Sequence, residues 1–390
     1  MSTIIRTFKI KLSPNNKQQS QMFHIADFAR YAYNWALATE ESNYENGGKF
    51  INDYELRRMF TEHKQTELWL YEVSNNALKQ SIKDACEAYR RFFRGQTKHP
   101  RFKSKKKTQP SFYMDVCKIE FTNTHVKLEK IADSKRVNRA KANWVRLVEN
   151  GRIPVGAKYS NPRITFDGLN WWISVGVEVE SKRKQPNGSP IGIDVGIKSL
   201  AVCSDGVGYP NINKTQTVKR LEKHHRRLQR QVSRKYQMNK KAVTYSKTSN
   251  IRKLEKRLLK SSKRLVNIRQ NHLHQTTSSI IAREPSVVVM EDLNIKGMMK
   301  NKRLAKAVQQ QSLYEFYRQM QYKCEWNNIV FITADRFYPS SKTCSHCGSI
   351  KKDLKLSDRT YACTCCGMIM DRDLNAAINL ASLAKPNIAA

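Results

Sequence analysis

The amino-acid sequence predicts a multidomain α/β protein. Helix-like and strand-like stretches alternate along its 390 residues, enough for two or three domains with sizeable cores. A polar segment, SKRKQPNGSP at 181–190, contains two prolines and a glycine and is typical of a linker. Paired cysteines crowd together near the C-terminus. We therefore expect two large parts divided at this linker, and a small metal-binding unit within the second part.

The first part begins with alternating apolar and basic residues in IIRTFKIKLSP, which predicts a half-exposed strand. Apolar residues then recur at three- and four-residue intervals from Asn16 to about Gly95, which predicts helices. A basic, proline-containing loop, GQTKHPRFKSKKK, follows. Residues 112–180 favour strands broken by turns, and DGLN at 167–170 is typical of a hairpin turn.

The second part opens with IGIDVGIKSLAVCSDG, which predicts two strands joined by a tight turn. A long basic helical stretch follows from Thr217 to Ala282, with a polar break at 245–250. PSVVVMEDL is a β-branched run typical of a buried strand, and IVFITADRFYP predicts another strand. Two further segments, KRLAKAVQQQSLYEFYRQMQYKCEWN and DLNAAINLASLAK, are predicted to be helical. The second should pack on a sheet through the face formed by Leu374, Ala377, Ile378 and Ala381.

Net charge is the strongest global feature of the chain. Lys and Arg outnumber Asp and Glu by 71 to 33, a formal charge of +38. Self-repulsion at this charge disfavours a compact state unless a polyanion binds, and nucleic acid is a commoner polyanion than a membrane surface. The N-terminus lacks a secretory signal, and no apolar run approaches the ~18 residues of a membrane span. Nucleic acid is therefore the expected partner; the alternative is a merely soluble basic surface.

Four of the nine cysteines form two C-x-x-C pairs, and each pair supplies two thiolates from one tight turn. Four protein ligands complete a tetrahedral zinc site, which predicts structural rather than catalytic zinc. Clustered cysteines are typical of a metal site in a reducing, intracellular compartment. Cys365 remains a spare thiol or an alternative ligand. The predicted ligands are Cys344, Cys347, Cys363 and Cys366.

Three acidic residues stand at the ends of predicted strands or helices: Asp194, Glu291 and Asp373. Phosphodiester hydrolysis with two divalent ions needs several carboxylates in one cleft. Each residue also has a plainer interpretation: Asp194 as a turn former, Glu291 as a solvated strand end, and Asp373, like Asp371, as a helix-capping acid. Within DRD we assign Asp371 to the cap and Asp373 to the cleft, although the spacing alone leaves this choice open.

Five segments of the second part follow one another in the order GIDVGIKSLAV, VVVMEDLNIKGM, FYPSSKTCSHCG, CTCCG and DRDLNAAINL. Through these segments the chain closely resembles the TnpB family. Members of this family are transposon-encoded, RNA-guided DNA endonucleases related to type V CRISPR effectors. The first half matches more loosely, through KIKLSP, ARYAYNWALA and HPRFKSKK. The resemblance implies a RuvC-like nuclease domain of RNase H-like fold with an inserted zinc ribbon. It also implies an N-terminal β-barrel wedge domain interrupted by a helical recognition lobe.

The family pattern implies six consecutive segments along this chain. They are the first part of the wedge at 1–12, the recognition lobe at 13–100, the second part of the wedge at 101–185, the first part of the nuclease at 186–339, the zinc ribbon at 340–370 and the last nuclease helix at 371–390.

The resemblance implies a metal-dependent endodeoxyribonuclease of a transposable element. A guide RNA transcribed from the transposon end would direct it to double-stranded DNA bearing a short adjacent motif. Asp194, Glu291 and Asp373 are implied to bind Mg²⁺ or Mn²⁺, as two ions, beside the structural Zn²⁺. The implied location is the cytoplasm of a prokaryotic host, at the nucleoid. The alternatives are a nuclease-inactive RNA-guided repressor, a strand-joining transposase and a generic zinc-ribbon DNA-binding protein.

Candidate nucleic-acid contacts lie on three basic segments. The helix at 75–90 could present polar side chains to base edges of the adjacent motif, while the basic loop and the long basic helices could bind phosphates. A solvated helix surface is the plainer interpretation for each of them. The candidates are Lys79, Gln80, position 104, Lys105, Arg226 and Arg227.

Overall fold

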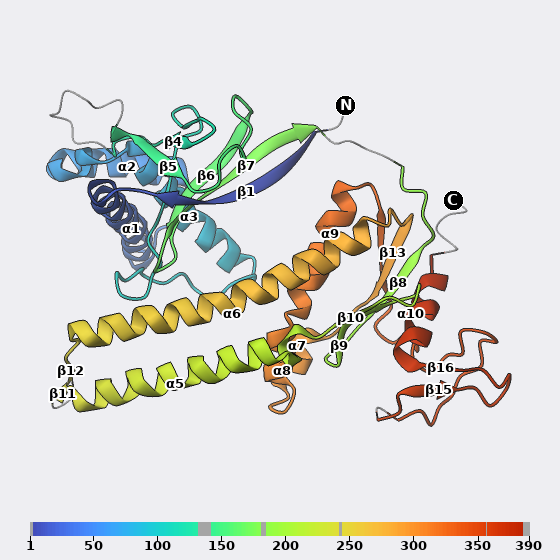
Figure 1. Ribbon diagram of the computed structural model, residues 1–390. Coiled ribbons are helices and arrows are strands. Elements are labelled where there is room, and N and C mark those ends of the chain that lie inside the picture. Colours follow the sequence, from blue (N-terminus) through green and yellow to red (C-terminus); the bar gives the residue numbers. More distant parts are fainter. Residues whose placement is uncertain (1–2, 132–141, 181–184, 242–243, 356, 385–390) are drawn as a thin grey trace. The chain divides into compact units, whose positions relative to one another are not determined.

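The structure is a computed structural model that describes residues 3–131, 142–180, 185–241, 244–355 and 357–384 (Figure 1). The chain divides into two compact units, Met1–Glu180 and Ser181–Ala390. This division falls at the start of the expected linker, of which residues 181–184 lie outside the described residues. Each unit is considered by itself below.

The first unit is built on a seven-stranded antiparallel sheet in the order β2-β6-β7-β1-β5-β4-β3. The predicted turn at 167–170 joins β6 to β7, and the Asp167 side chain accepts hydrogen bonds from the backbone N–H groups of Leu169 and Asn170. Among the described residues no ladder joins the edge strands β2 and β3, so hydrogen bonds do not close a barrel. The strands are β1 Thr3–Ser13, β2 Ser111–Tyr113, β3 Glu120–Phe121, β4 His125–Lys127, β5 Trp144–Leu147, β6 Tyr159–Phe166 and β7 Trp171–Glu180.

Helices of the first unit lie between β1 and β2 in the chain. They are α1 Asn16–Glu45, α2 Asp53–Thr66 and α3 Asn75–Phe93, with a 3-10 turn, η1, at Leu68–Glu72. Asn15 starts α1 with a capping box, because its side chain and that of Gln18 each accept the other's backbone N–H. One hydrophobic core joins these helices to the sheet, and Tyr33 is buried in it.

The second unit is built on a five-stranded sheet in the order β10-β9-β8-β13-β14. The three strands β8, β13 and β14 run parallel, whereas β9 and β10 pair antiparallel beside them. Both faces of β13 are covered: Val287 and Val289 pack with α10, and Val288 and Met290 pack with α6 and α9. This explains its uniformly apolar sequence. The strands are β8 Ile191–Val195, β9 Ser199–Cys203, β10 Gly208–Pro210, β13 Val287–Glu291 and β14 Val330–Ala334.

Two long helices form an antiparallel pair beside this sheet (Figure 1). They are α5 Gln216–Met238 and α6 Ser249–Ile281, joined through the short strands β11 Lys240–Lys241 and β12 Thr244–Tyr245, so the predicted helical stretch with a polar break is confirmed. The other elements of the unit are η2 Ile212–Lys214, α7 Ile295–Lys300, α8 Ala305–Gln311, α9 Leu313–Trp326, β15 Thr360–Ala362, β16 Ile369–Asp371 and α10 Arg372–Ser382.

Helix α10 packs closely on β8 at Gly192. A Cβ atom there would lie 2.0 Å from the Ala377 carbonyl oxygen and 2.4 Å from the Ala381 backbone nitrogen, so only glycine allows this approach. The packed face differs from the predicted one. Ala377 is buried as expected, but Leu374, Ile378 and Ala381 are only half-buried. The other buried positions of the helix are Asn375, Ala376, Asn379 and Leu380.

Candidate functional site

The three predicted carboxylates line one cleft of about 640 Å³ in the second unit. Strands β8 and β13 are parallel and pair Ile193 with Met290, so Asp194 and Glu291 follow at the same carboxyl edge of the sheet. Asp373 lies in the first turn of α10, which packs on β8. Sheet register and helix packing therefore bring together three residues that are far apart in the sequence.

The two aspartates of DRD have different structural roles. Asp371 is the N-cap of α10, and its Oδ1 accepts the backbone N–H groups of Asp373 at 2.9 Å and Leu374 at 3.2 Å. Asp373 lines the cleft, whereas Asp371 is not among the lining residues. The prediction that Asp371 caps the helix is confirmed.

Asp194 lies in a strongly negative environment. Burial raises the pKa of its carboxyl well above the ordinary value, and the charges of Glu291 and Asp373 raise it further, while Arg372 opposes them. Carboxylate oxygens are the donors that Mg²⁺ and Mn²⁺ prefer, so this donor set fits a divalent cation. Among the described residues, the oxygen atoms of these carboxylates do not lie as close together as the four cysteine sulfur atoms described below.

Ser340 contacts Glu291, and this contact was not predicted from the sequence. Its Oγ donates a hydrogen bond to Glu291 Oε1 at 2.5 Å, and the residue is only 3% exposed. Serine is common in loops, so its identity alone gave no signal; the contact depends on the path of the chain after β14.

Positive side chains also line the cleft, and sequence analysis did not single them out. They are Lys198, Lys214, Arg359 and Arg372. Arg372 and Arg359 are joined by a backbone hydrogen bond of 2.8 Å. With 71 lysines and arginines in the chain, charge alone could not identify these four.

The four predicted zinc ligands form a compact cluster. Their sulfur atoms all lie within 4.8 Å of one another. The Cys344–Cys366 and Cys347–Cys363 sulfurs are each 3.6 Å apart. Tetrahedral zinc with sulfurs at ~2.3 Å needs sulfur separations of ~3.8 Å, so the cluster fits the ion.

Details of the cysteine turns support this fit. Gly348 and Gly367 adopt φ values of 76° and 72°, which glycine reaches without strain. The Ser349 hydroxyl also contacts the Cys363 sulfur at 3.1 Å. Cys365 is exposed and is not part of the cluster.

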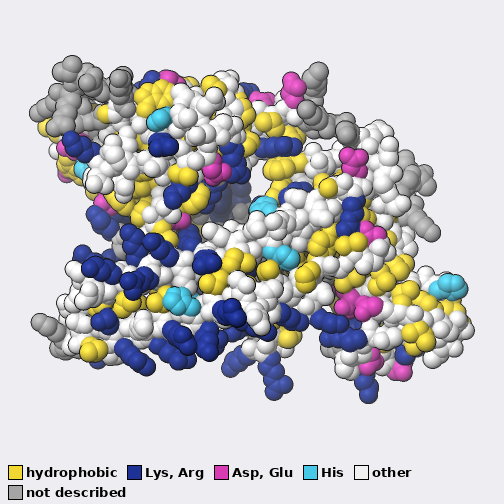
Figure 2. All heavy atoms as spheres, viewed as in Figure 1, with side chains coloured by type: hydrophobic (Ala, Val, Ile, Leu, Met, Phe, Trp, Pro, Cys, Tyr) yellow, Lys and Arg dark blue, Asp and Glu magenta, His cyan; other side chains and the backbone are white. Residues whose placement is uncertain are grey.

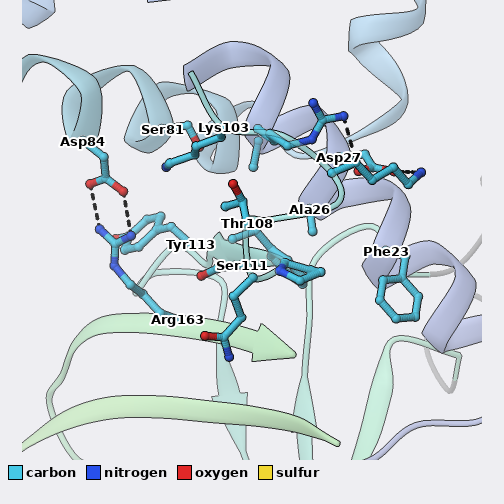
Figure 3. Close-up of a pocket in the computed structure, with 16 residues that line it drawn as sticks. Phe23, Ala26, Asp27, Ser81, Asp84, Lys103, Thr108, Ser111, Tyr113 and Arg163 are labelled. Atoms are coloured by element: carbon cyan, nitrogen blue, oxygen red, sulfur yellow. Dashed lines mark hydrogen bonds and ion pairs between the residues drawn. The ribbon is translucent and has the colours of Figure 1, made fainter. Parts of the chain in front are cut away.

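A separate pocket of about 310 Å³ lies in the first unit, between α1, α3 and the loop before β2 (Figure 3). At its edge, Arg163 binds Asp84 through two hydrogen bonds of 2.7 and 2.8 Å, and Gln80 donates to the same carboxylate at 2.9 Å. Lys105 lines the pocket and pairs with Asp27 at 2.6 Å. The polar edge of this pocket is therefore a network of paired charges.

The basic loop beside this pocket corrects one prediction. Position 104, named among the candidate phosphate contacts of this loop, is Ser104 and offers no positive charge; the neighbouring lysines are Lys103 and Lys105. Lys103 lies 3.4 Å from the centre of the Tyr33 ring, and burial lowers its pKa to about 8. Lys79 is exposed on α3.

The long helices of the second unit carry the clearest basic surface. Lys and Arg side chains gather over α5 and α6 in Figure 2. Arg226 and Arg227 are exposed on α5, and Arg226 borders a groove with Arg269 and Lys306. The structure thus places both predicted arginines at the surface.

Three family models match the chain. Residues 173–302 match a family described as "Probable transposase", residues 314–380 match "Cas12f1-like, TNB domain", and residues 1–49 match "Helix-turn-helix domain". In the structure the last of these segments contains β1, α1 and the residues after α1.

Two curated relatives align over most of the chain. A protein of Streptomyces pristinaespiralis named "Putative RNA-guided DNA endonuclease" is 28% identical over 97% of this chain and 89% of its own length. "Putative RNA-guided DNA endonuclease InsQ" of Escherichia coli (strain K12) is 29% identical over 96% of this chain and 91% of its own length.

A solved structure, "Cryo-EM structure of the Cas12f1-sgRNA-target DNA complex", matches with a TM-score of 0.51 and 13% identity, covering 97% of this chain and 99% of that chain. The chain therefore has an α/β fold similar to a Cas12 effector. None of the helices among the described residues is long and apolar enough to cross a membrane. The family models and the curated relatives confirm the predicted resemblance to the TnpB family.

Proposed function

We propose that this TnpB-like chain is an RNA-guided DNA endonuclease of a transposon, and that the cleft of the second unit is its nuclease centre. The observation that carries this proposal is the convergence of Asp194, Glu291 and Asp373 on one cleft. The names of the aligned relatives support RNA and DNA as partners, as do the sgRNA and target DNA of the matched Cas12f1 complex.

The three carboxylates would hold two Mg²⁺ or Mn²⁺ ions. Bound there, such ions supply activation of water and neutralise charge that develops on a phosphodiester. The chain itself orients Glu291 through Ser340 and presents Asp373 from the first turn of a capped helix. Arg359, Arg372 and the two cleft lysines would attract the DNA phosphate to the cleft.

The domain boundaries follow from the same proposal. Three parallel strands with two antiparallel strands on the β8 side support an RNase H-like nuclease at 186–339. The segment 371–390, which contains α10 and whose residues 385–390 lie outside the described residues, would complete it. Residues 340–370 would be a zinc ribbon whose closed cysteine set stabilises structure without catalysing the reaction. Segments 1–12 and 101–185 would form the wedge, and 13–100 the recognition lobe; residues 1–2, 132–141 and 181–184 of these segments lie outside the described residues.

Nucleic acid would bind outside the cleft mainly through its backbone. In this mode of recognition RNA–DNA pairing reads the sequence, while the protein holds the duplex by shape and charge. Arg226 and Arg227 on α5 would contact phosphates, as would Lys105 near the pocket of the first unit. Lys79 and Gln80 on α3 would read the adjacent motif.

Purified protein with its copurifying RNA tests the proposal. We expect sequencing to find one discrete transposon-end RNA, and we expect that complex to cut plasmid DNA carrying a matching target. Asp194→Ala should abolish cutting and retain the RNA. Asp292→Ala is the matched control, because Asp292 follows Glu291 in the sequence but pairs with Arg336 and does not line the cleft. This variant should still cut the target.

Three outcomes would contradict this proposal. Retained cutting by Asp194→Ala would show that the nuclease centre lies elsewhere. Guided DNA binding without cutting by the unaltered chain would favour a repressor, and heterogeneous cellular RNA would favour a general nucleic-acid binder.

A further inference from the structure

The segment Ser340–Ser345 connects the carboxylate cleft to the cysteine cluster. At its first residue, Ser340 Oγ donates to Glu291 Oε1 at 2.5 Å. Near its other end, Cys344 belongs to the cluster and is 2% exposed. Only three residues separate Ser340, which contacts Glu291, from Cys344, a candidate zinc ligand. The two candidate metal centres are therefore joined by one short stretch of backbone.

Two buried asparagines of α10 hold this segment in place. Asn379 Nδ2 donates to the carbonyl oxygens of Ser340 at 2.8 Å and Thr343 at 2.7 Å. Asn375 Nδ2 donates to the Thr343 carbonyl oxygen at 2.7 Å, and its Oδ1 accepts the Ser345 N–H at 3.0 Å. The segment is thus fixed on both sides of Cys344 to the same helix that carries Asp373.

This arrangement constrains the direction of the Glu291 carboxylate. A hydrogen bond to one oxygen restricts rotation of the group and leaves Oε2 available to an ion. Partners of this kind orient metal-binding carboxylates, and their loss typically weakens metal binding by about 10- to 100-fold. Because Ser340 is buried and its carbonyl is bound by Asn379, the hydroxyl cannot move away freely.

We propose that Ser340 is a positioning residue for Glu291, and that zinc in the cysteine cluster strengthens divalent-ion binding in the cleft by fixing the Ser340–Ser345 segment. The inference rests on the proposed function, because it takes the cleft to bind divalent ions. Coupling of this kind is reciprocal, so an ion in the cleft would also stabilise the cysteine cluster.

Binding of Mn²⁺ to the purified full-length protein tests the first half of the proposal. Electron paramagnetic resonance of free Mn²⁺ gives the affinity directly, without a cleavage assay. Ser340→Ala should weaken binding about 10- to 100-fold while zinc content and melting temperature stay close to those of the unaltered protein. In cleavage assays its half-saturating Mn²⁺ concentration should rise, and activity at saturating Mn²⁺ should largely return.

Ser382→Ala is the matched control, because it removes a serine hydroxyl on α10 that binds the Asn379 carbonyl oxygen and does not touch Glu291. It should leave Mn²⁺ affinity unchanged. Unchanged affinity in Ser340→Ala would overturn the inference while leaving the nuclease proposal intact. If the unaltered protein showed no Mn²⁺ binding sensitive to Asp194→Ala, the proposed function itself would fail.

A double-mutant cycle tests the link to zinc. Cys347→Ser removes an exposed ligand of the cluster and should also weaken Mn²⁺ binding. If zinc acts through Ser340, adding Ser340→Ala to this variant should weaken binding by less than the two separate effects combined. Fully additive effects, or unchanged Mn²⁺ affinity in zinc-depleted Cys347→Ser, would overturn the coupling.

Discussion

The cysteine cluster and the carboxylate cleft, both in the second unit, are assembled in opposite ways. The cluster takes four ligands from two tight turns, and its sulfur atoms already lie within 4.8 Å of one another. The cleft takes three carboxylates from two parallel strands and a helix, and among the described residues they do not form so tight a set. The first site depends on local spacing and the second on tertiary packing, so different mutations should disrupt them.

The largest expected effect is loss of zinc from the cysteine cluster. Cys366→Ser should release zinc and unfold the segment around it, because structural zinc couples about 10–16 kcal/mol of apparent binding free energy to folding. Cys365→Ser, at the exposed neighbouring thiol outside the cluster, is the control and should retain zinc. Zinc content by mass spectrometry and hydrogen exchange across 344–371 measure both. Equal zinc loss in the two variants would contradict the ligand assignment.

The next effect separates the two aspartates of DRD. Asp373→Asn should reduce guided cleavage by at least about 100-fold, because it removes a metal ligand itself. Loss of a residue that only hydrogen-bonds to a metal ligand typically lowers activity less, by about 10- to 100-fold. Asp371→Asn should cleave normally, because asparagine caps a helix about as well as aspartate. A plasmid cleavage assay compares them. The reverse ranking would exchange the roles of the cap and the metal ligand.

A third prediction tests whether packing builds the cleft. Gly192→Ala should destabilise the second unit by about 1–3 kcal/mol, because the new methyl group would overlap the backbone of α10. Gly208→Ala, where a Cβ would meet nothing within 4 Å, is the matched control and should change stability far less. Urea unfolding gives both values. Similar losses in the two variants would mean that the contact of α10 with β8 is not tight.

The smallest expected effect lies outside both candidate centres. Burial alone would raise the pKa of Asp84, but hydrogen bonds from Arg163 and Gln80 outweigh it and lower that pKa. The stability that Asp84 contributes is therefore present above its unfolded pKa of about 3.9 and is lost as pH falls through the folded value. Unfolding free energies measured from pH 6 downward should fall more steeply for the unaltered chain than for Asp84→Asn; identical slopes would contradict the pairing.

Features set by neighbouring residues could be predicted from the sequence. The C-x-x-C pairs indicated the cysteine cluster, and the helix start after DRD indicated Asp371 as a cap. The β-branched run of β13 indicated a strand buried on both faces. In each case the responsible interactions lie within a few residues or depend on hydrophobicity alone.

Features set by tertiary packing could not be predicted in the same way. Nothing near Ser340 in the sequence shows that it binds Glu291, and nothing distinguishes Arg359 from the other basic residues. The predicted packing face of α10 was partly wrong because periodicity marks Leu374 and Ile378 as apolar, whereas the helix buries two asparagines that bind the Ser340–Ser345 segment.

The central claim is that three distant carboxylates form one nuclease centre. Guided cleavage by Asp194→Asn, Glu291→Gln and Asp373→Asn, alone and in pairs, tests it most directly. Residues that act as one unit have strongly non-additive effects, so each single variant should already lose nearly all cleavage and each pair should lose little more. Substantial cleavage by any single variant, or losses that multiply in the pairs, would contradict a shared centre.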